Sequence, residues 1–72
     1  MTIIEQIEVF FVDNANGWAC ARFDESGSQV GEAEYYFHRL DAIIGAKCMA
    51  GDAGCDTPIV VFRKDGSRGA TL

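Results

Sequence analysis

The stretch IEQIEVFFV at residues 4–12 decides the fold class, because its apolar and polar residues alternate. Ile7, Val9 and Phe11 fall on one face of an extended chain, and Glu8 and Phe10 fall on the other. β-Branched and aromatic residues suit such a half-buried surface. The sequence therefore predicts a strand at residues 4–12 that needs a covering layer on one side.

Two further strands are expected directly after the first. The cluster DNANG at 13–17 predicts a turn in which Asn16 and Gly17 supply positive φ, and WACARF at 18–23 predicts the second strand of an antiparallel hairpin. After a polar connection, EAEYYF at 32–37 predicts a third strand. Its alternation places Tyr35 and Phe37 on one face and Tyr36 on the other.

From residue 39 the apolar period changes to that of a helix. Leu40, Ile43, Ile44 and Cys48 recur at spacings of three and four, which predicts one buried helix face, with Met49 beside it. The helix is expected to end at one of two glycines, at 51 or 54, so that residues 50–58 form a loop.

The C-terminal part predicts a strand over 58–64, PIVVFRK, and a tight type I′ turn at Asp65-Gly66. The whole chain is then one α+β domain, residues 1–72, with an antiparallel sheet of four strands packed on one helix in the order β-β-β-α-β. The segment SRGATL at 67–72 adds a fifth strand if it pairs. The expected core residues are Ile7, Val9, Phe11, Leu40, Ile44, Val60 and Phe62.

Charge is distributed unevenly along the chain, which carries a net charge of −5. Residues 1–38 hold seven acids and one base, and residues 39–72 hold four acids and five bases. An acidic surface is repelled by nucleic acid and favours a protein partner with a basic surface. Acids that only keep a small domain in solution explain the same composition.

The polar residues give no pattern that indicates catalysis. Cys20, Cys48 and Cys55 and the single histidine, His38, show no C-x₂₋₄-C spacing typical of zinc sites and no pairing of thiol with imidazole. We therefore expect no enzyme activity, no metal and no cofactor. The N-terminal residues lack the basic start of a signal peptide and any long apolar run, so we expect a cytoplasmic protein with reduced thiols and no membrane contact.

The hypothesis that follows is a protein-binding module that uses its acidic half. Three consecutive aromatics at 35–37 cannot all face one small core, so one of them is expected on the surface with acids around it. A simpler reading keeps Tyr35 and Phe37 in the core and Tyr36 as an isolated surface side chain. The predicted partner-binding residues are Glu5, Glu8, Asp24, Glu25, Glu32, Glu34 and Tyr36.

Two alternatives remain open. Arg63, Lys64 and Arg68 flank the last hairpin, and with Trp18, Tyr35 and Tyr36 as stacking platforms they would suit a module that binds single-stranded nucleic acid. The other alternative is a structural domain that forms oligomers.

The order Gly17-Trp18, alanines at 42, 46 and 50, and IVVFRKDG at 59–66 resembles a family of small bacterial domains of unknown function. That resemblance implies turn roles for Gly17, Asp65 and Gly66, a packing role for Trp18, and a close helix-to-sheet contact through the alanines. The size, acidity and layout also resemble phage-encoded anti-CRISPR proteins. This likeness implies an inhibitor from a mobile element that occupies a basic surface of a nucleic-acid-binding complex.

Overall fold

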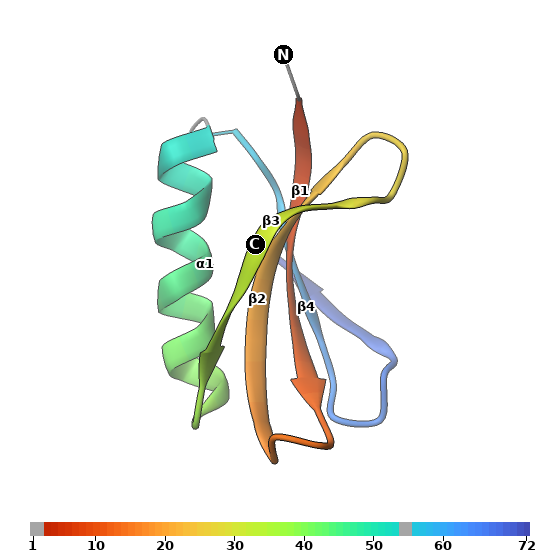
Figure 1. The fold of residues 1–72 in the computed structure, drawn as a ribbon, viewed down its shortest axis with the longest axis vertical. Coiled ribbons are helices and arrows are strands. Elements are labelled where there is room, and N and C mark those ends of the chain that lie inside the picture. Colours follow the sequence, from red (N-terminus) through yellow and green to blue (C-terminus); the bar gives the residue numbers. More distant parts are fainter. Residues whose placement is uncertain (1–2, 54–55) are drawn as a thin grey trace.

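The computed structural model describes residues 3–53 and 56–72, which form one five-stranded sheet with one helix against it (Figure 1). In chain order the elements are β1 (Ile4–Val12), β2 (Gly17–Asp24), β3 (Gln29–Tyr36), α1 (Arg39–Ala53), β4 (Ile59–Phe62) and β5 (Arg68–Thr71). The α+β class and the order β-β-β-α-β-β are confirmed, including the fifth strand.

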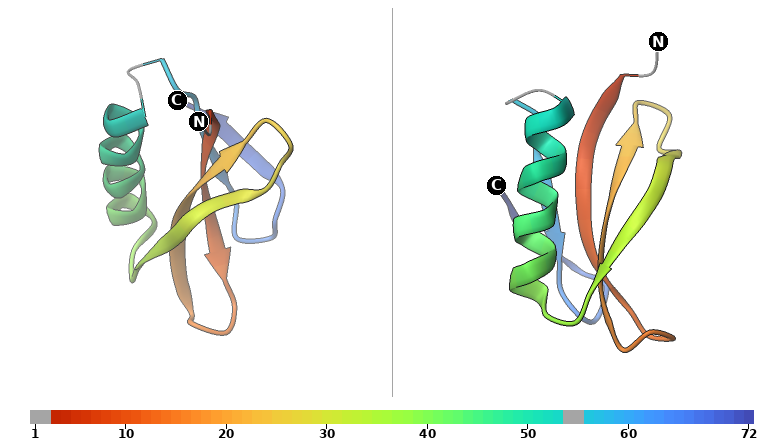
Figure 2. Two further views of the ribbon diagram at one scale, coloured as in Figure 1. Left: turned by 45° about the horizontal axis from the view of Figure 1, so that its top comes forward. Right: turned by 60° about the vertical axis from the view of Figure 1, so that its left-hand side comes forward.

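The sheet is mixed, whereas the sequence predicted an antiparallel one without a parallel pair of strands. Its strand order is β3-β2-β1-β4-β5, and β1 and β4 run parallel with Ile7 opposite Ile59. The helix is the reason: it carries the chain from the lower end of Figure 1 back to the upper end, where β1 also begins (Figures 1 and 2). Parallel neighbours need such a crossover connection.

Three-residue loops close two of the hairpins. Residues 24–28 and 63–67 each form a turn followed by a glycine with positive φ, Gly27 at 86° and Gly66 at 91°. The predicted type I′ turn at 65–66 is wrong, since that turn needs positive φ at both central residues and Asp65 does not have it. Instead Asp65 accepts hydrogen bonds from the backbone and hydroxyl of Ser67.

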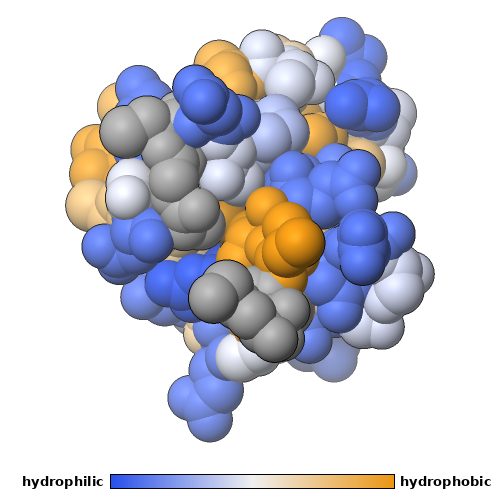
Figure 3. All heavy atoms as spheres, turned by 90° about the horizontal axis from the view of Figure 1, so that it is seen from above, coloured by the Kyte–Doolittle hydropathy of each residue, from blue (hydrophilic) through white to orange (hydrophobic). Residues whose placement is uncertain are grey.

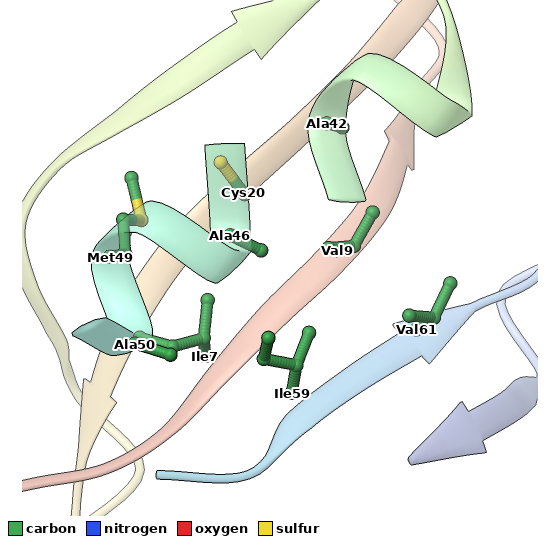
Figure 4. Close-up of a cluster of buried hydrophobic side chains, with 9 residues drawn as sticks. All are labelled: Ile7, Val9, Cys20, Ala42, Ala46, Met49, Ala50, Ile59 and Val61. Carbon is green, nitrogen blue, oxygen red and sulfur yellow. The ribbon is translucent and has the colours of Figure 1, made fainter. Parts of the chain in front are cut away.

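The core lies between α1 and one face of the sheet, and small residues line the helix side of it. Figure 4 shows three alanines and one methionine of α1 over side chains from β1, β2 and β4. The nine buried residues are Ile7, Val9, Cys20, Ala42, Ala46, Met49, Ala50, Ile59 and Val61. The alanine spacing of four, which the family resemblance singled out, marks the packed face of the helix.

The predicted buried face of the helix is wrong for its largest members. Leu40, Ile44 and Cys48 are exposed, whereas Met49 is buried in the core as expected and Ile43 packs against it, half-buried. At 100° per residue the three exposed side chains point away from Ala42 and Ala46, which hold the sheet side. The alanines allow α1 to approach the strands closely, and bulkier residues there would hold it off.

A glycine completes this close approach. A Cβ on Gly45 would lie 2.7 Å from the Cζ atom of Tyr36, so the tyrosine ring packs directly over the helix backbone. Gly51 has open space around it and lies inside α1, so the expectation that it ends the helix is wrong. The other proposed end, residue 54, and the third cysteine, residue 55, lie outside the described residues.

The opposite face of the sheet carries a smaller apolar set. Ala19, Ala21 and Val60 are buried there, with Phe10 and Phe62 half-buried beside them. The strand register places these residues together, because Glu8 stands opposite both Ala21 and Val60. Val60 is therefore buried as expected, whereas Phe62 is only half-buried. Phe11 lies half-buried on the helix side against Trp18.

Candidate functional site

Exposed apolar side chains follow one another closely in the sequence where β3 passes into α1. Among the described residues, six large hydrophobic side chains are exposed, and four of them lie between residues 35 and 44. Their exposed fractions are 66% for Tyr35, 79% for Phe37, 69% for Leu40 and 56% for Ile44. Exposed apolar groups scattered singly are ordinary, but a run of this kind indicates an interaction surface. We call these four side chains the 35–44 surface.

The orientation of the three consecutive aromatics follows from strand pairing. Tyr36 stands opposite Trp18 on the helix side of the sheet, where it is half-buried against α1, and Tyr35 stands opposite Ala19 on the other side. The expectation that Tyr35 and Phe37 belong to the core is therefore wrong, since β3 ends at Tyr36 and Phe37 lies beyond it. One of these three aromatic side chains was expected to be exposed, whereas two are, Tyr35 and Phe37.

The hydroxyl of Tyr36 is held by its own strand. It donates a hydrogen bond of 2.7 Å to Oε1 of Glu34, and this bond to a carboxylate raises the pKa of Tyr36 to about 12. Tyr36 is therefore a packing residue that stays protonated. Glu34 is exposed and partly committed to this bond, and Glu32 is exposed nearby on the same edge strand.

A shallow hollow of about 220 Å³ lies beside the 35–44 surface. The turn between β1 and β2 forms one wall, and Trp18, Tyr35, Tyr36 and Phe37 form much of the other. Asn16 has a φ of 48°, as expected, but Gly17 does not adopt positive φ. Gly17 is required for a different reason, because a Cβ there would lie 2.8 Å from the backbone oxygen of Tyr36.

Four of the predicted acidic residues meet at the opposite end of the molecule. Glu5, Glu8, Asp24 and Glu25 line a hollow of about 210 Å³ beside Phe23. Hydrogen bonds from the Ser26 hydroxyl and from backbone N–H groups hold the pKa of Asp24 below its usual value. Figure 3 looks onto this end and shows many hydrophilic residues, with hydrophobic ones near the centre of the view and at the left-hand edge on the side of α1.

The seven predicted partner-binding residues thus fall into two places. Glu5, Glu8, Asp24 and Glu25 line one hollow, whereas Glu32, Glu34 and Tyr36 lie on β3. The sequence analysis missed Leu40 and Ile44, because their helical spacing was assigned to the core. The competing alanine spacing was the signal that could have identified them.

Basic and aromatic side chains form a third group. Arg39 lies over the ring of Trp18 at 5.8 Å, Trp18 meets Phe11 edge-on at 5.4 Å, and Lys64 lies over Phe11 at 4.8 Å. Arg63 joins them around a hollow of about 310 Å³. Of the residues proposed for nucleic acid, this brings together Trp18, Arg63 and Lys64.

Three other residues of that proposal lie elsewhere. Arg68 donates to the hydroxyl of Thr71 on β5, and Tyr35 and Tyr36 line the neighbouring hollow. The sequence analysis did not include Arg39 in this basic and aromatic group. Arg39 is the first residue of α1, and sequence spacing alone does not bring it next to Trp18, which lies 21 positions earlier on β2.

The thiols and the imidazole do not form a reactive group in the part of the chain that the structure describes. Cys20 is buried, and burial raises the pKa of its thiol to about 11, while Cys48 is exposed on α1. His38 lies beside Phe37, with ring centroids 5.8 Å apart, and its carbonyl accepts the first hydrogen bond of α1 from Ala42. Across residues 3–53 and 56–72, no group of three or more His, Cys, Asp or Glu residues could hold a metal ion.

The fold and these surfaces define a small α+β domain with a mixed five-stranded sheet. Comparison with family models, curated proteins and solved structures found no match to this chain. The resemblances drawn from the sequence stay predictions. Within the described residues, no helix has the length and apolar character needed to span a membrane.

Proposed function

We propose that this protein is a protein-binding module whose contact surface is the 35–44 surface. The observation that carries the proposal is the reversal of the helix: α1 turns alanines inward and Leu40 and Ile44 outward. A helix that only covered a sheet would gain more by burying its larger aliphatic side chains, at about 1.5–3 kcal/mol for each one. Leaving them exposed is favoured when a partner covers them.

The chemistry of the surface supports a partner with basic residues around an apolar contact. Exposed aromatic side chains are common anchors of protein interfaces, and Tyr35 and Phe37 supply two of them. Glu32 and Glu34 on β3 and Asp41 in the first turn of α1 are exposed acidic groups close in sequence to this surface. Together with the net charge of −5, these acidic groups favour a basic partner, such as a protein that handles nucleic acid. Occupying that basic surface would make the module an inhibitor.

The test compares two double variants in capture of partners from a cell lysate. L40Q/I44Q removes two apolar side chains of the 35–44 surface and keeps good helix formers. I3Q/L72Q makes the same kind of change at two exposed hydrophobic residues elsewhere. We expect proteins captured by the unmodified chain to be lost by at least about tenfold with L40Q/I44Q, since each interface anchor contributes more than 1 kcal/mol.

The control variant should keep those proteins. Equal capture by L40Q/I44Q and the unmodified chain would reject the 35–44 surface as the contact. Glu32→Lys tests the acidic groups separately, because Glu32 is exposed and forms no hydrogen bond to Tyr36 like that of Glu34. Charge reversal there should weaken capture and make it less sensitive to salt.

A further inference from the structure

The hollow beside Trp18 is a second surface with a chemistry of its own. It has a volume of about 310 Å³, near the lower limit for small-molecule sites, and is lined by Trp18, Arg39, Arg63 and Lys64. Half of the six basic residues of the chain thus surround one indole ring in an acidic protein. Basic residues that served only to keep the surface hydrated would not need to lie around the same aromatic ring.

The aromatic part of the site offers a stacking platform. Trp18 is the aromatic residue that lines the hollow, and the ring of Phe11 meets it edge-on at 5.4 Å. A guanidinium lies 5.8 Å from the centre of the indole ring, and an ammonium lies 4.8 Å from that of Phe11. Flat π systems stack on indole and guanidinium groups, and phosphate oxygens bind to the same cations.

The cations come from two elements that the fold holds together. Arg39 is the first residue of α1, and Arg63 and Lys64 begin the loop after β4. Asp65 lies in the same loop, but its carboxylate accepts hydrogen bonds from Ser67. The positive groups are therefore the ones that line the hollow.

From this geometry we infer that the hollow binds a nucleotide unit, with its base on Trp18 and its phosphate among Arg39, Arg63 and Lys64. This goes beyond the proposed protein contact and uses different side chains. A free nucleotide and a residue of a single strand share this chemistry. Stacking on an aromatic side chain contributes about 1–3 kcal/mol per base.

The single tryptophan of the chain lines this hollow and the neighbouring one of about 220 Å³, so its fluorescence reports a ligand bound in either. Lys64 lines the first hollow and not the second, so its substitution assigns the signal. Oligothymidylate of about eight nucleotides is titrated at several salt concentrations, and thymidine monophosphate in a second series. With three cations engaged, log K should fall against log[salt] with a slope of about −2, from about −0.7 per phosphate. Quenching by the monophosphate alone assigns the site to free nucleotides, and stronger quenching by the strand assigns it to single strands.

The matched variants Lys64→Gln and Lys47→Gln distinguish the effect of a positive charge in the hollow from the effect of the protein's net charge. Both variants lose one positive charge, but Lys47 is exposed on α1 and does not line the hollow. Lys64→Gln should weaken binding and reduce the salt slope by about 0.7, while Lys47→Gln should change it much less.

Three results would overturn the inference. These are no fluorescence change at low salt with either ligand, equal losses in the two variants, and equal quenching by an oligoglutamate, which has charge but no base. The L40Q/I44Q variant should keep nucleotide binding, so this site and the proposed protein contact can fail independently.

Discussion

Replacing Gly45 with alanine tests how closely α1 approaches the sheet. The new Cβ would lie 2.7 Å from Cζ and 2.9 Å from Cε2 of Tyr36, closer than such atoms can stand. The ring must move, and it is half-buried with its hydroxyl bonded to Glu34. Gly51 is the matched control, since it lies in the same helix and a Cβ there meets nothing within 4 Å.

Two opposing effects set the magnitude. Alanine is favoured over glycine in a helix by about 0.8–1.0 kcal/mol, and this gain applies equally at both positions. Overpacking at Gly45 costs about 1–3 kcal/mol, because Tyr36 must leave its place over the helix. We therefore expect Gly51→Ala to raise the free energy of unfolding by about 1 kcal/mol. Gly45→Ala should lie about 1–3 kcal/mol below it, near neutral or destabilising.

Urea unfolding measures the difference. With a slope near 1 kcal/mol per molar urea for a chain of this size, the two midpoints should differ by about 1–3 M. In a Tyr36→Ala background the collision is gone, so Gly45→Ala should become stabilising by about 1 kcal/mol. If Gly45→Ala stabilises the unmodified protein as much as Gly51→Ala does, Tyr36 does not pack on α1 and the reasoning is refuted.

Three further predictions concern the thiols, the hairpin carboxylate and the start of β2. Cys48 should react with a thiol reagent at pH 8 in the native protein, whereas Cys20, which is buried and has a raised pKa, should react only on unfolding. Peptide mapping distinguishes the two cysteines, and rapid labelling of Cys20 in the native protein would contradict its burial. Because folding lowers the pKa of Asp24, its charged form stabilises the protein above the unfolded pKa of about 3.9, and this contribution is lost as the pH falls below it. The unfolding free energies of Asp24→Asn and the unmodified protein should therefore differ at pH 7 and converge in acid, and a gap that persists in acid would exclude this linkage. Gly17→Ala should destabilise by about 1–3 kcal/mol, measured by urea unfolding, because the Tyr36 carbonyl that it meets is backbone and cannot move aside.

The sequence was sufficient to predict the strands, because their apolar alternation and turn residues are local signals. The fifth strand and the order of elements followed from these signals. The parallel pairing of β1 with β4 did not, since it depends on which end of the sheet the helix crosses to. Both three-residue loops contain a glycine with positive φ. The sequence predicted a polar connection containing glycine for the first loop, and for the second a type I′ turn, which the structure does not have.

The helix shows where periodicity fails. Two sets of side chains repeat every four residues on opposite faces of this helix. The larger set is Leu40, Ile44 and Cys48, and the smaller set is the alanines at 42, 46 and 50. Hydrophobicity favours burying the larger set, whereas close packing of a helix on a short sheet favours the smaller one. The alanine spacing was the signal in the sequence for the exposed face of α1, but the prediction followed the spacing of the larger residues instead.

The acidic residues were predicted as one site, but they fall into two groups. Glu5 and Glu25 are brought together because β1 begins beside the hairpin that joins β2 and β3. Glu32 and Glu34 share only their own edge strand. The clustering of Trp18 with Arg39, Arg63 and Lys64 likewise arises from strand order, which no local pattern encodes.

The free energy of unfolding of L40Q/I44Q tests the central claim most directly, namely that α1 packs through its small residues and presents its large ones to a partner. If Leu40 and Ile44 face solvent, urea unfolding should give a change within about 0.5 kcal/mol for each substitution. If they were core residues, each would cost about 2–5 kcal/mol, and the small domain would lose most of its stability. A loss of that size would contradict the account.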